Sequence, residues 1–179
     1  MADRLEGGPT DPLPRQPIDS AAYERRSREG PCFVCRTLAG DPDYPGHFVW
    51  TDDHAAAFLA SYNTLLGHTL IAPRAHREQV TADFEIEEYL ALQRLVYRVG
   101  EAICQELPTA RLYIMSQGSQ SGNRHVLWHV APLPPGVPYQ EQQFAAFSWD
   151  RGVLALPDDD LADLARRIGA RVQQMHQAG

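Results

Sequence analysis

The sequence has no long apolar run, and no apolar signal core near its start. We therefore expect no membrane span and a cytoplasmic protein. Basic residues are in the minority, since 16 lysines and arginines stand against 23 acidic residues, for a formal net charge of −7. Such a surface does not neutralise a phosphate backbone, so we expect no nucleic-acid partner. A small phosphorylated ligand is not excluded, because it needs only a few local donors.

Cysteine is scarce as well, with three residues in the chain, of which Cys32 and Cys35 form a Cys-x-x-Cys pair. In a reducing compartment this pair indicates metal or redox chemistry and not a structural disulfide. A redox motif needs a strand before the pair, which the sequence lacks, whereas two thiolates on one turn can form half of a zinc site. His76 and His125 are candidates for the other two ligands, although spacing alone does not bring them together. His76 is equally consistent with a surface histidine after a strand.

The order of elements predicts one α+β domain. Residues 1–30, with prolines, glycines and charges but little apolar periodicity, are interpreted as a mobile or loosely docked arm. Residues 31–138 form the expected domain, and residues 139–179 an extension that ends in an amphipathic helix. Strands are expected within 47–52, 54–60, 67–76, 110–117 and 125–132, and a short helical turn within 32–40. A hairpin followed by a meander favours a mostly antiparallel sheet packed on helices.

Two helices are expected from apolar stripes at the helical period. The stripe of the first, within residues 84–107, consists of Ile86, Leu90, Leu92, Val96, Val99 and Ile103. The stripe of the second, within residues 161–175, consists of Leu161, Leu164, Ile168 and Val172. Asp158, Asp159 and Asp160 precede the second helix, where negative charge is favoured, so we interpret them as capping residues and not as metal ligands.

The most informative stretch is Ser121–Gly136, SGNRHVLWHVAPLPPG. In its strand pattern His125, Leu127 and His129 share one face, because side chains alternate along a strand. The preceding polar loop either holds a phosphate through backbone N–H groups or is an ordinary turn. The candidate phosphate-binding residues are Ser116, Gln117, Gly118, Ser121, Gly122 and Asn123. Asn63 either contacts a ribose hydroxyl or caps a turn, and His68 is expected to make a structural hydrogen bond.

Together, CFVCRTLAG, GHTLIAPRAH and GNRHVLWHVAP resemble the histidine triad (HIT) family over about residues 31–138. The family's His-x-His-x-His strand becomes His125-x-Leu127-x-His129 here. The resemblance implies a five-stranded antiparallel sheet, a homodimer with a ten-stranded sheet, and a purine nucleotide or nucleotide-containing ligand. It also implies a structural zinc ion on Cys32, Cys35, His76 and His125.

In active members of this family the middle histidine attacks the α-phosphorus, and a nucleotidyl-histidine intermediate forms. Leu127 stands at that position and has no lone pair, so we expect this chain to be inactive or weakly active. A register shifted to make His129 the middle residue remains an alternative, but it removes His125 from the zinc ligands.

Three interpretations follow from Leu127. The chain belongs to a nucleoside-phosphate hydrolase or nucleotidyl-transfer scaffold whose nucleophile has been replaced. Alternatively it is a natural pseudoenzyme that senses nucleotide or binds a partner. The third alternative is a changed chemistry in which His129 acts as a general base. The segment 133–144 is expected to close over one side of the pocket, with Tyr139 or Phe144 near the ligand.

Overall fold

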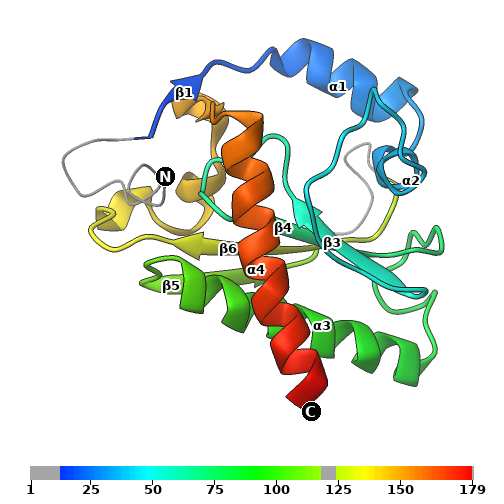
Figure 1. Ribbon diagram of the computed structural model, residues 1–179. Coiled ribbons are helices and arrows are strands. Elements are labelled where there is room, and N and C mark those ends of the chain that lie inside the picture. Colours follow the sequence, from blue (N-terminus) through cyan, green and yellow to red (C-terminus); the bar gives the residue numbers. More distant parts are fainter. Residues whose placement is uncertain (1–12, 118–123, 179) are drawn as a thin grey trace.

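A computed structural model describes residues 13–117 and 124–178 (Figure 1). Its centre is a five-stranded sheet in which every neighbouring pair is antiparallel. The strands follow the order β2 (Phe48–Thr51), β3 (Ala55–Leu59), β4 (Thr69–Pro73), β6 (Trp128–Leu133) and β5 (Arg111–Met115). This confirms the predicted α+β fold with its five-stranded antiparallel sheet.

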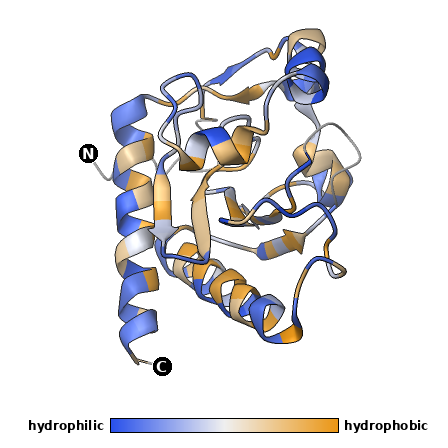
Figure 2. Cartoon of the chain, turned by 90° about the vertical axis from the view of Figure 1, so that its right-hand side faces the viewer, coloured by the Kyte–Doolittle hydropathy of each residue, from blue (hydrophilic) through white to orange (hydrophobic). Residues whose placement is uncertain are grey.

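One face of the sheet is covered by α3 (Ile86–Glu106) and α4 (Asp158–Ala178). Val126, Trp128 and Val130 point into this layer and are buried there with the apolar sides of both helices. The two helices show the mixture of hydrophobic and hydrophilic residues expected when only one side of a helix is buried (Figure 2). No helix in the described part of the chain has the length and apolar content needed to cross a bilayer.

The predicted stripe of α3 is wrong at its beginning. Ile86 and Leu90 are 65% and 39% exposed, whereas Leu92 belongs to the core. At about 100° per residue, Ile86 and Leu90 lie about 120–160° around the helix from Leu92, and so on its outer side. Leu95 takes the core position that the prediction omitted.

The opposite face of the sheet carries α2 (Phe33–Leu38) and the segment that leads to it, α1 (Ser20–Glu29) (Figure 1). Here Val34, Phe58, Leu70 and Leu127 form a second, smaller apolar cluster. The alternation predicted for the stretch around Leu127 is therefore present, with Val126 and Trp128 on one face and Leu127 on the other. Regular strand pairing begins only at Trp128, so His125 and Leu127 precede β6 instead of lying within it.

Several short elements towards the two ends of the chain were not expected from the sequence. β1 (Arg15–Gln16) and α1 lie within the segment interpreted as an arm, and β1 pairs with β7 (Val153–Leu154) in a separate two-stranded ladder. Three 3-10 helices, η2 (Tyr139–Glu141), η3 (Gln143–Phe147) and η4 (Trp149–Arg151), precede β7. These elements gave no periodic signal, because α1 has no buried residue and the two strands are two residues long.

Candidate metal centre and ligand cavity

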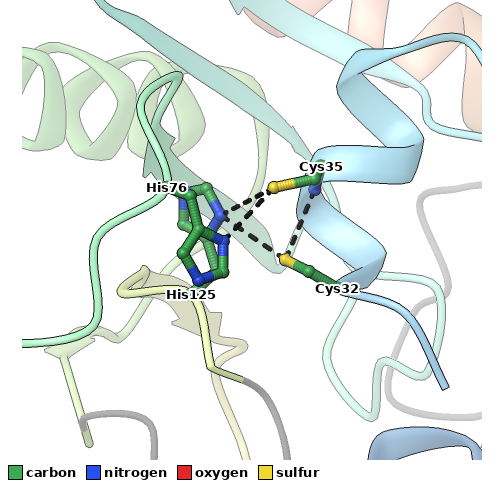
Figure 3. Close-up of side chains that lie close together, drawn as sticks. All are labelled: Cys32, Cys35, His76 and His125. Carbon is green, nitrogen blue, oxygen red and sulfur yellow. Dashed lines mark hydrogen bonds between the residues drawn. The ribbon is translucent and has the colours of Figure 1, made fainter.

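Cys32, Cys35, His76 and His125 converge at the start of α2 (Figure 3). One ligand atom from each residue lies within 4.8 Å of the others. His125 Nδ1 is 3.5 Å from each of the two sulfur atoms, and His76 Nδ1 is 3.3 Å from Cys35 Sγ. A tetrahedral zinc ion with ordinary bond lengths separates sulfur and nitrogen ligands by about 3.6 Å. The donor set and its spacing therefore fit a tetrahedral metal site.

The outer nitrogens of both histidines support this arrangement. His125 Nε2 lies 2.8 Å from the carbonyl oxygen of Pro73, and His76 Nε2 lies 3.4 Å from Glu78 Oε1. An N–H donated to these oxygens leaves the lone pair on Nδ1, which faces the sulfur atoms. Burial lowers the pKa of His125 to about 4, opposed by the bond to Pro73, so the ring is in the neutral form that binds metals.

The two cysteines are brought together by the short helix. Cys32 caps α2, and its sulfur accepts a hydrogen bond from the backbone N–H of Cys35 at 3.5 Å. Burial, together with the neighbouring Cys32, raises the pKa of Cys35 to about 11. The two sulfur atoms lie within 4.8 Å of each other, so two thiolates there repel each other in the absence of a cation. A divalent metal ion removes this repulsion.

Beside this cluster a cavity of about 890 Å³ opens on the same face of the sheet, and Cys32 and His76 belong to its lining. Its floor includes three residues that lie side by side on neighbouring strands. His129 on β6 is opposite Leu70 on β4 and Met115 on β5, and all three line the cavity. Leu127 also lines the cavity and is 8% exposed. The position predicted to lack the nucleophile is therefore an apolar surface next to a histidine.

His129 is held by a second histidine. His68 Nε2 lies 3.0 Å from His129 Nδ1, and His68 Nδ1 is buried and has no hydrogen-bond partner among the described residues. A buried N–H without a partner is rarer than a buried acceptor without one, so we assign the shared proton to His68 Nε2. His129 then accepts at Nδ1 and carries its own proton on Nε2, the nitrogen that remains for the cavity. The hydrogen bond expected for His68 is confirmed.

Both rings are neutral near pH 7. Burial, with a contribution from His129, lowers the pKa of His68 to about 3, and burial also lowers the pKa of His129. The pair therefore presents a single uncharged N–H donor to a ligand in the cavity.

Comparison with known proteins identifies this architecture. The HIT domain family matches residues 41–134, which is more than half of the chain. The chain belongs to the HIT domain family. Among curated proteins, "Protein hit" of Bacillus subtilis is 31% identical over 144 residues, which cover 79% of this chain and 94% of that protein. The matched region lies within the domain predicted at residues 31–138.

Solved structures share this HIT fold. A hypothetical histidine triad nucleotide-binding protein from Sulfolobus tokodaii superimposes with a TM-score of 0.64 at 22% identity, over 80% of this chain and 93% of that one. A Zn-bound histidine triad family protein from Mycobacterium smegmatis gives a TM-score of 0.63 at 20% identity, over 83% and 97%. At these identities the likeness establishes the fold of the HIT domain.

The predicted nucleotide-binding residues are only partly brought to the cavity. Gln117, Leu127 and His129 line it. Asn63 and Ser116 do not belong to the lining. Asn63 is buried, and its Nδ2 donates to the carbonyl of Ala60, which does line the cavity. Within the described residues, Asn63 Oδ1 and Ser116 Oγ are buried without a hydrogen-bond partner. The predictions for Gly118, Ser121, Gly122 and Asn123 fall outside the described residues. Of the two aromatic residues expected near the ligand, Phe144 lines the cavity, whereas Tyr139 is 84% exposed and does not.

Much of the cavity wall comes from outside the matched HIT domain and was missed from the sequence. Tyr23 and Arg26 of α1 and Trp149 of η4 line it. Tyr23 contacts Tyr62 and Trp149 edge-on, with ring centres 5.2 and 4.7 Å apart. The aromatic side chains of Tyr23 and Trp149 were the signal available in the sequence.

The buried His68 leads to a prediction about pH. Its pKa is near 3 in the folded protein and about 6.5 when unfolded, so below pH 6.5 the unfolded chain takes up a proton that the folded chain does not. Stability is therefore lost as pH falls from 6.5 towards 3, by about 2–3 kcal/mol at pH 4.5. His68→Gln keeps a donor for His129 but does not titrate. We expect urea unfolding of the variant to show a shallower loss between pH 7 and 4.5, and parallel curves would contradict this role for His68.

Proposed function

We propose that the chain binds a nucleotide in the cavity, with a phosphate oxygen accepting a hydrogen bond from His129 Nε2. The observation that carries this proposal is the 3.0 Å contact between His68 Nε2 and His129 Nδ1, from which we assigned the tautomer of His129. A neutral N–H held in one direction is a suitable donor to an anionic oxygen. Membership of the HIT domain family and the nucleotide-binding protein from Sulfolobus tokodaii support the same ligand class.

We further propose that the bound nucleotide is not transferred to the protein. The covalent route needs a nucleophile beside the phosphate, and the side chain of Leu127 offers no lone pair. The alternative in which His129 acts as a general base is disfavoured, because its cavity-facing nitrogen already carries a proton in the assigned tautomer. The function proposed is therefore nucleotide binding on a nucleotidyl-transfer scaffold, as in a pseudoenzyme or an enzyme that has lost its nucleophile.

The proposed metal is zinc in a structural role. Cys32, Cys35, His76 and His125 would fill all four positions of a tetrahedral ion and leave none for a substrate. The Zn-bound neighbour from Mycobacterium smegmatis supports the choice of metal.

Titration calorimetry with AMP and with adenosine tests the proposed ligand. We expect AMP to bind and adenosine to bind about tenfold more weakly, because a hydrogen bond to a charged group contributes roughly 1.5–3 kcal/mol. His129→Phe removes the donor and keeps a ring of similar size, so it lowers the affinity for AMP to that for adenosine. AMP should remain intact after long incubation. Equal affinity for AMP and adenosine in the unaltered protein would refute the phosphate contact.

The homodimer with a continuous ten-stranded sheet stays a prediction. Its structural requirement is an edge strand with a free side, and β5 is at one edge of the sheet with Ile114 49% exposed. The mass in solution, measured by light scattering, decides between one chain and two.

A further inference from the structure

A wall of the cavity is formed by α1, which lies outside the matched HIT domain. We define residues 13–31, which contain β1 and α1, as the N-terminal strap. The strap reaches the cavity at Tyr23 and Arg26, and it ends immediately before the cluster residue Cys32. In Figure 1 it crosses from β1 to α2 on the side of the sheet opposite α3.

The other end of the strap is fixed by backbone pairing. Arg15 pairs with Leu154 in the β1–β7 ladder, and its guanidinium donates to the carbonyl oxygens of Gly152 at 3.1 Å and Thr64 at 2.8 Å. Gly152 has a φ of +75°, and a Cβ on it would lie 2.4 Å from the carbonyl oxygen of Gln16. The close approach of the two chain segments therefore requires glycine at this position.

The strap does not contribute to the hydrophobic core. No residue of α1 is buried, and its docking depends on the contacts of Tyr23 with Tyr62 and Trp149. A helix with no fully buried residue contributes little stability through apolar burial. What it does contribute is a set of side chains at the mouth of the cavity.

Arg26 is the most constrained of these side chains. Its guanidinium lies over the rings of Tyr62 and Tyr44, at 5.2 and 5.6 Å from their centres, and it donates to the hydroxyl of Tyr62 at 2.6 Å. Stacking on tyrosine orients the guanidinium plane. One of its five N–H groups is used by Tyr62, so the others remain for a ligand.

Of the three arginines that line the cavity, the strap carries two, and Arg26 is the one of these two without an ion pair among the described residues. Arg28 pairs with Glu24 at 3.0 Å, whereas Arg124 directly precedes the cluster residue His125 and lies outside the strap. Asp43 and Glu29 also line the cavity, and their negative charges offset the positive charges of the arginines there. An anion there must be bound by a directed guanidinium and not by net charge.

We propose that Arg26 binds a second anionic group of the nucleotide, beyond the phosphate held by His129, and that the N-terminal strap positions it for this purpose. The proposal rests on the proposed nucleotide function. His129 lies within the matched HIT domain at residues 41–134, whereas Arg26 lies outside it, in the strap. We therefore assign Arg26 to a group of the ligand other than the phosphate bound by His129. The ligand class is then a nucleoside diphosphate, or a nucleotide with a longer phosphate chain, in preference to a monophosphate.

Calorimetry with AMP and ADP on the full chain tests this assignment, with Arg26→Ala as the variant. Arg25→Ala is the matched control, because Arg25 is on the same helix and does not line the cavity. We expect the unaltered protein and Arg25→Ala to bind ADP about tenfold more tightly than AMP, the range of one charge-assisted hydrogen bond. Arg26→Ala should lose that preference and keep its affinity for AMP.

Retained AMP binding shows that the cavity of the variant is intact. If Arg26→Ala binds ADP as the unaltered protein does, or weakens AMP and ADP equally, the assignment of Arg26 is refuted while the proposed function stands. If the unaltered protein binds AMP and ADP equally, the second anionic group is refuted in the same way. Absence of binding to either nucleotide refutes both proposals, and that result is obtained before any variant is made.

Discussion

Replacing Leu127 with histidine is expected to give the protein nucleotidyl-transfer activity. The new imidazole would stand on the cavity floor, on the same face as His129. It would supply the attacking lone pair, and His129 Nε2 would stabilise negative charge on the phosphate oxygens. We expect hydrolysis of adenosine phosphoramidates and diadenosine polyphosphates to rise by about 10³-fold or more, since loss of a nucleophile in enzymes has effects of this size.

The expected gain has a structural cost. Leu127 packs with Phe58 and Leu70, and a histidine there leaves apolar contacts unfilled and a polar group partly buried. We expect a loss of about 1–3 kcal/mol in the free energy of unfolding, which a chain of this size tolerates. The activity of the variant should therefore be measured at a temperature at which thermal unfolding shows that it is folded.

Leu127→Gln is the control for polarity without nucleophilicity. It should remain inactive, whereas Leu127→His should acquire the mass of a nucleotidyl group when the reaction is quenched early. A histidine variant that folds and binds AMP but neither turns over nor becomes labelled would show that the site has drifted beyond repair, which is the pseudoenzyme interpretation. Turnover by the unaltered chain would refute the proposed role of Leu127.

Disruption of the metal cluster is expected to have the largest effect on stability. Cys35→Ser removes one of four ligands that connect α2 to the end of β4 and the start of β6. Structural zinc couples its binding energy to folding, and a contribution of about 5 kcal/mol corresponds to a fall of about 10–20 °C in melting temperature at this chain length. Removal of the metal from the unaltered protein with a strong chelator should produce a similar fall.

Cys104→Ser is the matched control, because Cys104 is exposed and lies outside the cluster. It should melt as the unaltered protein does and retain one zinc ion per chain by elemental analysis. If Cys35→Ser and the chelated protein also melt unchanged, or if the purified protein contains no stoichiometric metal, the zinc proposal fails.

The sheet could be predicted because its signals are local. Alternation around Leu127 separates Val126 and Trp128 from His125 and His129, and a strand preserves that separation in the fold. The convergence of His76 with Cys35 could not be derived from spacing, since it depends on how β4 and α2 meet. The family resemblance supplied that information, and the structure brings the four residues together.

The cavity wall was beyond sequence reasoning for a different reason. Arg26 and Tyr23 occur in a polar helix without a buried side, where hydrophobic periodicity carries no signal. The partner of β1 is about 140 positions away in sequence, and two-residue strands leave no alternation to detect. For Asn63 the sequence left open a ribose contact or a local cap, and the structure shows a local hydrogen bond from its Nδ2 to the carbonyl of Ala60.

The β1–β7 ladder makes the two ends of the chain interdependent. In the described structure β1 takes its strand partner from the C-terminal extension, and β7 takes its partner from the N-terminal strap. Truncation to the matched HIT domain at residues 41–134 would therefore remove far more than two tails. It would delete the cavity wall that α1 and η4 form, together with Cys32 and Cys35. The part of the cavity lined by His129 would then be open to solvent. Deleting either end alone would leave the other without its strand partner, so the segments on both sides of the matched HIT domain behave as a single structural unit.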